Sequence, residues 1–160
     1  METSTHAHHA VRPHAAGGSW PEAARATLHC LTGCAIGEIL GLVIGTALGL
    51  STGATIVLAI ALAFGFGYAL TLTPVLRSGV ALTAALAVTL AADTVSITVM
   101  ELVDNSVVLV IPGAMDAGLS SVLFWGSLAV SLAVAFVLTV PVNRWLISRG
   151  RGHAVVHGLH

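Results

Sequence analysis

The chain has 160 residues, of which 56% are hydrophobic and only 8% are charged, and its formal net charge is −1. Because a soluble domain carries about 25% charged residues, this composition excludes a soluble domain and predicts an integral membrane protein. The near-neutral charge gives no reason to expect nucleic acid as a partner. The sequence has no nucleotide-binding loop, nucleophile elbow or HExxH zinc helix, so we expect no enzyme.

The first predicted segment, residues 1–27, is polar. We expect a mostly disordered cytoplasmic tail in which residues 22–27 form a short helix at the membrane surface. The segment lacks the short apolar region and cleavage site of a signal peptide, so we expect no cleavable one. Its histidines favour a solvated tail over a loose metal site. They are His6, His8, His9 and His14.

The second segment, residues 28–50, is long and apolar enough to cross a bilayer as a helix. Glycine recurs at every fourth position, at Gly33, Gly37, Gly41, Gly45 and Gly49. Because each fourth residue advances by only about 40° around a helix, these glycines form one slowly winding face. Such a face lets another helix approach closely. We expect it to serve helix packing, by default in a homodimer or another homo-oligomer.

Beside the glycine face lie polar groups that lipid excludes: His29, Cys30, Cys34 and Glu38. A charged carboxyl deep in an apolar span costs about 2.5 kcal/mol or more to insert, so such groups usually face a bundle interior and mark a pathway or a ligand site. We therefore predict a functional role for Glu38. The cysteines are four residues apart on one helix, a poor geometry for a disulfide, and we expect free thiols.

Three further helices are predicted, over residues 54–72, 80–103 and 119–140. The predicted fold is all-α, an integral membrane four-helix bundle, followed by a basic, histidine-containing tail over residues 143–160. With four spans, both tails and the middle loop share one side. That side holds every basic residue, namely Arg12, Arg25, Arg77, Arg144, Arg149 and Arg151. The positive-inside rule makes it cytoplasmic, so we expect both termini inside.

The third predicted helix carries a second polar stripe, made of Asp93, Ser96, Met100, Glu101 and Asp104. At about 100° per residue, Asp93, Met100 and Asp104 fall within about 40° of one another. Counting residues from the cytoplasmic side, we expect Glu38 and Asp93 to lie at similar depth near mid-membrane. If the first and third helices touch, the polar groups of the first helix line the inner half of a track and this stripe lines the outer half.

The pattern His29-Cys30-x-x-Gly33-Cys34-x-x-Gly37-Glu38 resembles the hallmark of an uncharacterised bacterial family of small four-helix membrane proteins, a domain of unknown function. Later blocks are similar too: Ala92-Asp93-Thr94-x-Ser96, Met100-Glu101, Pro112-Gly113-Ala114-Met115 and Pro141-Val142-Asn143-Arg144-Trp145. The resemblance covers about residues 28–157. It implies a multi-pass protein of the bacterial inner membrane and no particular activity.

Soft ligands in the first and third helices predict a metal site. Thiolate, thioether and imidazole suit copper(I), and thiolate and imidazole also suit zinc. We expect a copper ion first and a zinc ion second as the cofactor, with no organic cofactor, held by His29, Cys30, Cys34 and Met100. In this interpretation the protein binds and transports the ion through the interface of the two helices. The relay residues are Glu38, Asp93, Ser96, Glu101 and Asp104.

Two alternative functions remain open on the sequence. The first is a proton- or cation-coupled carrier of small molecules that uses Glu38 and Asp93. The second is a membrane assembly partner that transports nothing and binds a larger complex through the glycine face. Substitutions distinguish the carrier from the metal-binding protein. Replacing Glu38 with Gln is expected to stop transport by a carrier, whereas replacing the cysteines with serine is expected to abolish metal binding.

Overall fold

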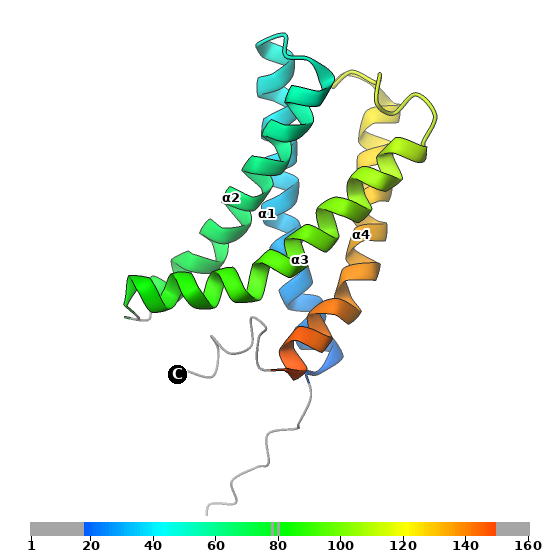
Figure 1. Ribbon diagram of the computed structural model, residues 1–160. Helices are drawn as coiled ribbons and strands as arrows, with labels where there is room; N and C mark the ends of the chain where they lie inside the picture. Colours follow the sequence, from blue (N-terminus) through cyan, green and yellow to red (C-terminus); the bar gives the residue numbers. More distant parts are fainter. Residues whose placement is uncertain (1–17, 78, 80, 150–160) are drawn as a thin grey trace, which may run out of the picture.

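The computed structural model of the chain describes residues 18–77, 79 and 81–149. This part contains four helices and no strand: α1 (Trp20–Ala47), α2 (Thr52–Arg77), α3 (Leu82–Val110) and α4 (Val122–Ser148) (Figure 1). The prediction of an all-α fold is confirmed. Three of the helices, α1, α2 and α4, are long and apolar enough to cross a membrane. The tail histidines, Arg12 and Arg151 lie outside the described residues.

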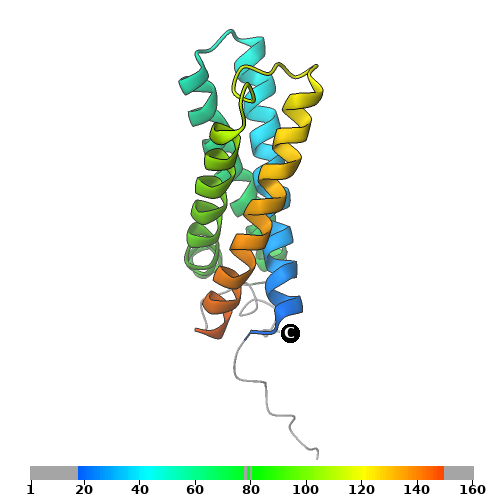
Figure 2. The same ribbon diagram turned by 90° about the vertical axis from the view of Figure 1, so that its right-hand side faces the viewer.

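The helices pack mainly as two antiparallel pairs, α1 with α2 and α3 with α4. α1 also lies along α4, as both views show (Figure 1 and Figure 2). α3 crosses obliquely: its C-terminal half rises beside α4, whereas its N-terminal half diverges from α4 toward the C-terminal end of α2 (Figure 1). α1 and α3 contact each other over a shorter stretch. The contact between first and third helices that the polar track requires therefore exists within one chain.

The two ends of the molecule differ in charge. α1 begins, and α2 and α4 end, at the same end of the molecule (Figure 1). The terminal turns there carry Arg25, Arg77, Arg144 and Arg149. We name this the arginine end, and the opposite end, with residues 48–51 and 111–121, the loop end. The one-sided arginines agree with the sequence pattern, while the side of the membrane that each end faces stays a prediction.

α1 begins earlier than the sequence pattern predicted, because Ser19 and Glu22 form a capping box. The Glu22 carboxylate accepts a hydrogen bond from the Ser19 backbone N–H at 3.0 Å, and the Ser19 hydroxyl accepts one from the Glu22 N–H at 3.4 Å. Pro21 occupies the first turn, where its missing N–H costs nothing. The expected tail helix over residues 22–27 is therefore the first part of α1 rather than a separate surface element.

α4 also extends further than predicted, passing through Pro141 to Ser148. Tertiary contacts hold this last part, since the Asn143 amide donates a hydrogen bond of 2.8 Å to the buried Thr27 hydroxyl of α1. The Arg144 guanidinium lies 4.2 Å from the centre of the Trp20 ring. Residues 143–148, predicted to be part of a cytoplasmic tail, thus belong to the helical core at the arginine end.

The glycine face of α1 packs against α2 of the same chain. The contacts recur every four residues along both helices, which run antiparallel. They pair Gly33 with Gly67, Gly37 with Ala63, Gly41 with Ala59 and Gly45 with Thr55. A Cβ added to Gly33 would lie 2.7 Å from the Gly67 Cα, and one added to Gly37 would overlap the backbone of Ala63. Only glycine permits this approach of two backbones. We name these eight residues the small-residue seam.

Gly49 is not part of the seam. It follows the end of α1, has φ +63°, and has open space where a Cβ would lie. Glycine adopts this left-handed conformation without steric cost, which suits the turn after a helix. Because α2 covers the other four glycines, a homo-oligomer would have to form through another surface than the one we expected; the oligomer itself stays a prediction.

Candidate functional site between α1 and α3

Four carboxyl groups are buried where α1 meets α3 or beside it: Glu38, Asp93, Glu101 and Asp104. α1 supplies one face through Cys30, Cys34 and Glu38, which recur every fourth residue beside the seam. The small-residue seam sets the rotation of α1 about its axis. Because the glycine side of α1 packs against α2, the thiols and the carboxyl beside it face α3. The interface forms three levels, from the arginine end toward the loop end.

The first level pairs Cys30 with Asp93. The Cys30 thiol donates to the Asp93 Oδ1 at 4.0 Å, a long contact typical of sulfur. Ser96, three residues from Asp93 on the same face of α3, is also buried. Tyr68 of α2 borders this level through a hydrogen bond of 3.0 Å between its hydroxyl and that of Thr94. The level therefore joins polar groups of α1, α2 and α3 in the half of the molecule nearer the arginine end.

The second level pairs Cys34 with Glu101, and the third pairs Glu38 with Asp104. Asn105 steadies Glu101, since its amide donates to the backbone O of Glu101 at 2.8 Å and to Oε2 at 3.5 Å. Along α1 each level is four residues from the next, so the column from Cys30 to Glu38 extends about 12 Å. We name these paired groups the carboxyl–thiol column.

Asp104 is the least satisfied group of the column. It is 2% exposed, and neither of its carboxyl oxygens has a hydrogen-bond partner within the described residues. It interacts across the interface with Glu38, itself 9% exposed. No basic side chain of the described residues forms an ion pair with Glu38, Glu101 or Asp104. Burying carboxylates without a cation costs several kcal/mol each, so the column requires protons or a bound cation.

The expectation that Glu38 and Asp93 lie at similar depth is not met by the pairing of residues between α1 and α3. Glu38 lies opposite Asp104, and Asp93 lies opposite Cys30, so Glu38 and Asp93 are about two helical turns apart rather than level. The two polar stripes are also side by side rather than end to end. The physical reason is the oblique path of α3: its first residues run across the molecule, so a residue count does not convert into depth (Figure 1).

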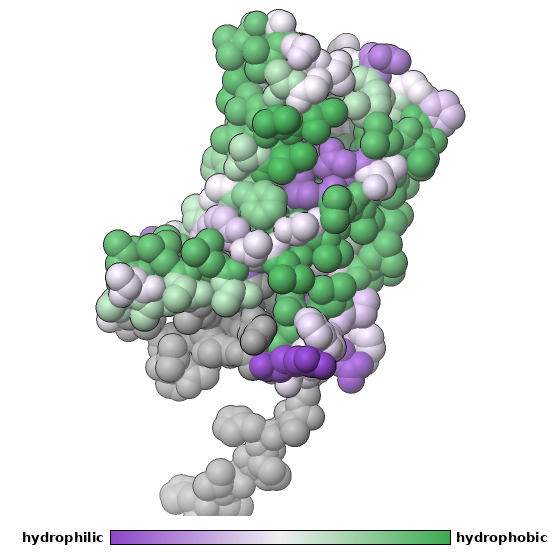
Figure 3. Space-filling view, viewed as in Figure 1, coloured by the Kyte–Doolittle hydropathy of each residue, from purple (hydrophilic) through white to green (hydrophobic). Residues whose placement is uncertain are grey.

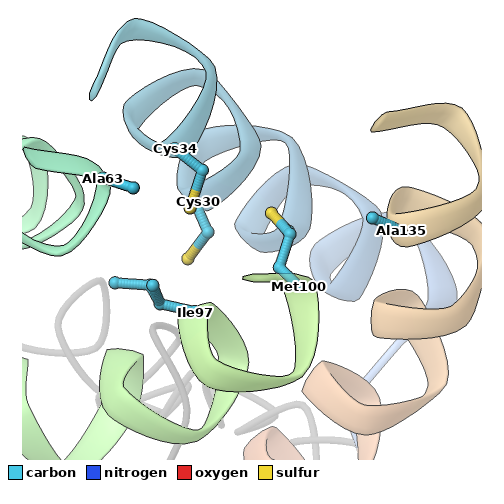
Figure 4. Packing of buried hydrophobic residues seen from close by; sticks show 6 residues of the cluster. All are labelled: Cys30, Cys34, Ala63, Ile97, Met100 and Ala135. Atoms are coloured by element: carbon cyan, nitrogen blue, oxygen red, sulfur yellow. The ribbon is translucent and has the colours of Figure 1, made fainter. Parts of the chain in front are cut away.

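The expected soft ligands come together only in part. Cys30, Cys34 and Met100 lie in one buried cluster with Ile97, and the side chains of Cys30 and Met100 extend from α1 and α3 into the space between these helices (Figure 4). Both cysteines are free thiols, as predicted. Within the described residues, however, no three His, Cys, Asp or Glu side chains are arranged to hold a metal ion. His29 therefore does not complete a site with the two thiols.

A cavity of about 220 Å³ adjoins the column at the loop end. All four helices line it, and Glu38 lies both in the column and in the cavity wall. In the space-filling view, hydrophilic residues are visible between the upper parts of α2 and α3, bordered mainly by hydrophobic residues (Figure 3). We name this space the loop-end cavity. Its lining residues include Thr46, Thr55, Asn105, Val108, Met115, Phe124 and Ser127.

Sequence reasoning missed Asn105 and the cavity. Asn105 follows Asp104 directly and lies four residues from Glu101, a spacing that allows a hydrogen bond on one helix face, so a signal was present. The cavity had none, because its wall combines residues from six separate segments of the chain.

The fold and the column define a class: a small helical protein with three helices long and apolar enough to cross a membrane, and with buried ionisable groups between α1 and α3. A family model described as "Domain of unknown function (DUF4396)" matches residues 19–152, so the chain belongs to this family. No curated protein and no solved structure matches the chain.

Proposed function

We propose that this protein is a proton-coupled carrier of a small molecule in the membrane. The carboxyl–thiol column carries the proton, and the loop-end cavity receives the substrate. The observation behind the proposal is the double position of Glu38, which faces Asp104 in the column and lines the cavity. One carboxyl in contact with both can couple them, because a proton and a substrate that share it bind in alternation.

The arginine end faces the cytoplasm in this proposal, following the positive-inside rule, and the loop-end cavity opens outward. The column then leads from the cavity toward the cytoplasmic half through groups that accept or donate protons. These are the Glu38–Asp104 pair, the Cys34–Glu101 pair and the Cys30–Asp93 pair. The bacterial inner membrane, which the family resemblance implies, supplies the proton gradient that such a carrier uses.

Proton entry into liposomes tests this function. Purified protein is reconstituted with an internal pH-sensitive dye, and a potassium diffusion potential set with valinomycin drives protons inward. Without substrate Glu38 is free to pass protons along the column, so we expect entry at least tenfold faster than in empty liposomes. We expect a return to the empty-liposome rate in the Glu38→Gln variant. The control is Glu22→Gln, an exposed carboxyl whose capping role glutamine also fulfils. Equal rates in wild-type and empty liposomes would overturn the proposal.

A copper-binding function is the second candidate, favoured by the cluster of Cys30, Cys34 and Met100. Two thiolates and a thioether suit copper(I) better than zinc, which takes four nitrogen, oxygen or sulfur ligands. These three residues would hold the ion between α1 and α3.

Elemental analysis decides on the copper site. Protein purified from copper- and zinc-supplemented medium is expected to contain close to one copper per chain, and the Cys30→Ser/Cys34→Ser variant is expected to contain none. A Met100→Leu variant serves as a matched change of similar volume and is expected to lose most of the copper. If the wild-type protein and the serine variant hold equal amounts of metal, the thiols have a packing role only.

A further inference from the structure

The loop-end cavity has the chemical character of a site for a positively charged organic molecule. Among its sixteen lining residues, Glu38 is the only one with an ionisable side chain, and no basic residue is present. Its remaining wall combines apolar residues, among them Phe124 from α4 and Met115 from the segment after α3, with uncharged polar ones. The polar residues are Thr46, Thr52, Thr55, Asn105 and Ser127. Aromatic faces attract cations, and a flexible thioether adapts to irregular apolar groups.

Asp104 places a second buried carboxyl next to the Glu38 position. It interacts with Glu38 across the α1–α3 interface, is almost fully buried, and forms no ion pair with a basic side chain of the described residues. A cation held at Glu38 would interact with both carboxyl groups in a medium of low dielectric constant, where such attraction is strong.

Other ligand classes fit less well. An anion would face a carboxyl with no basic side chain to balance it. A metal ion lacks ligands, since a single carboxyl lines the cavity and the described residues contain no three-ligand group. A polar neutral molecule would find the threonine hydroxyls of the wall, but it would leave the buried Glu38 carboxyl without a counter-charge.

We infer that the loop-end cavity binds a small organic cation, an amine carrying methyl or other apolar groups, with its nitrogen beside Glu38 and its apolar part against Phe124 and Met115. This inference rests on the proposed function and names the class of its substrate. The cavity volume of about 220 Å³ is below the range of drug-sized pockets, about 300–1,000 Å³, which limits the ligand to a small molecule.

Equilibrium dialysis of the full-length protein in detergent micelles tests the inference. The probe is benzyltrimethylammonium, and its counterpart is benzylsulfonate, which has a similar shape and the opposite charge. Empty micelles provide the background. We expect saturable one-to-one binding of the cation and none of the sulfonate, and an affinity at least tenfold lower for Glu38→Gln. Glu22→Gln should bind as the wild type does. Equal binding of the two probes, or unchanged affinity in Glu38→Gln, would overturn the inference.

A second variant tests the cavity without altering the column. Ala117 lines the cavity from a segment outside the helices, so Ala117→Leu fills space without disturbing helix packing. We expect it to weaken cation binding at least fivefold. Unchanged cation binding would contradict the assigned position. Cation binding without proton entry in the wild type would overturn the proposed function alone, and proton entry without cation binding would overturn this inference alone.

Discussion

Replacing Gly37 with alanine is expected to lower the free energy of unfolding by about 3 kcal/mol, at the upper end of the usual cost of overpacking. The added Cβ would overlap the backbone N and Cα of Ala63 and the carbonyl carbon of Leu62. Backbone atoms cannot rotate away as a side chain can, so α1 and α2 would have to separate along the whole seam. Reversible unfolding in mixed micelles of sodium dodecyl sulfate and dodecylmaltoside measures the change.

Gly65→Ala is the matched control for this prediction. Gly65 lies in α2, the same helix that Gly37 contacts, but a Cβ there would meet nothing within 4 Å. Because alanine favours helix over glycine by about 1 kcal/mol, the control variant is expected to keep or slightly gain stability. If Gly37→Ala were as stable as Gly65→Ala, the close approach of α1 to α2 would be incorrect.

The sequence predicted the seam but not its partner. Glycine at every fourth position from Gly33 to Gly45 is visible in the chain, and it indicates close helix approach whatever the partner is. The matching residues of α2 are less conspicuous, since Ala59, Ala63 and Gly67 lie in a helix rich in alanine and glycine. The partner of the glycine face is either α2 of the same chain or a second copy of the chain. The turn between α1 and α2 decides this, because it is short enough to force the two helices into an antiparallel pair.

Of the helix boundaries, the start of α1 was predictable from the sequence and the end of α4 was not. The capping signal Ser19-x-x-Glu22 was readable and would have placed the start of α1 correctly. The continuation of α4 through Pro141 was not readable, because proline usually ends a helix and the compensating contact comes from Thr27, far away in sequence.

For the site, the face of each helix was predictable and the register between the helices was not. Helical periodicity alone places Cys30, Cys34 and Glu38 on one side of α1, and the structure keeps them together. Pairing Glu38 with Asp104 instead of Asp93 depends on how α3 tilts across the molecule. Tilt arises from packing against neighbouring helices, which a residue count from the membrane surface does not contain.

The Asp104→Asn variant is expected to be more stable than the wild type, by about 1–3 kcal/mol, and to lose proton entry at least tenfold. A buried carboxyl without a hydrogen-bond partner costs about this much. The amide removes the ionisable group and gives Glu38 a donor instead. The unfolding measurement in mixed micelles and the liposome proton assay, applied to one preparation, test both expectations.

Asp116→Asn is the control, because Asp116 is exposed in the segment between α3 and α4 and the same chemical change there should alter neither quantity. A loss of stability in Asp104→Asn would mean that the carboxyl is held by a partner and has a structural role. A gain in stability with proton entry intact would show that the carboxyl is dispensable to the column. Higher stability together with lost proton entry is the result expected of a functional site, where a destabilising group is retained for what it does.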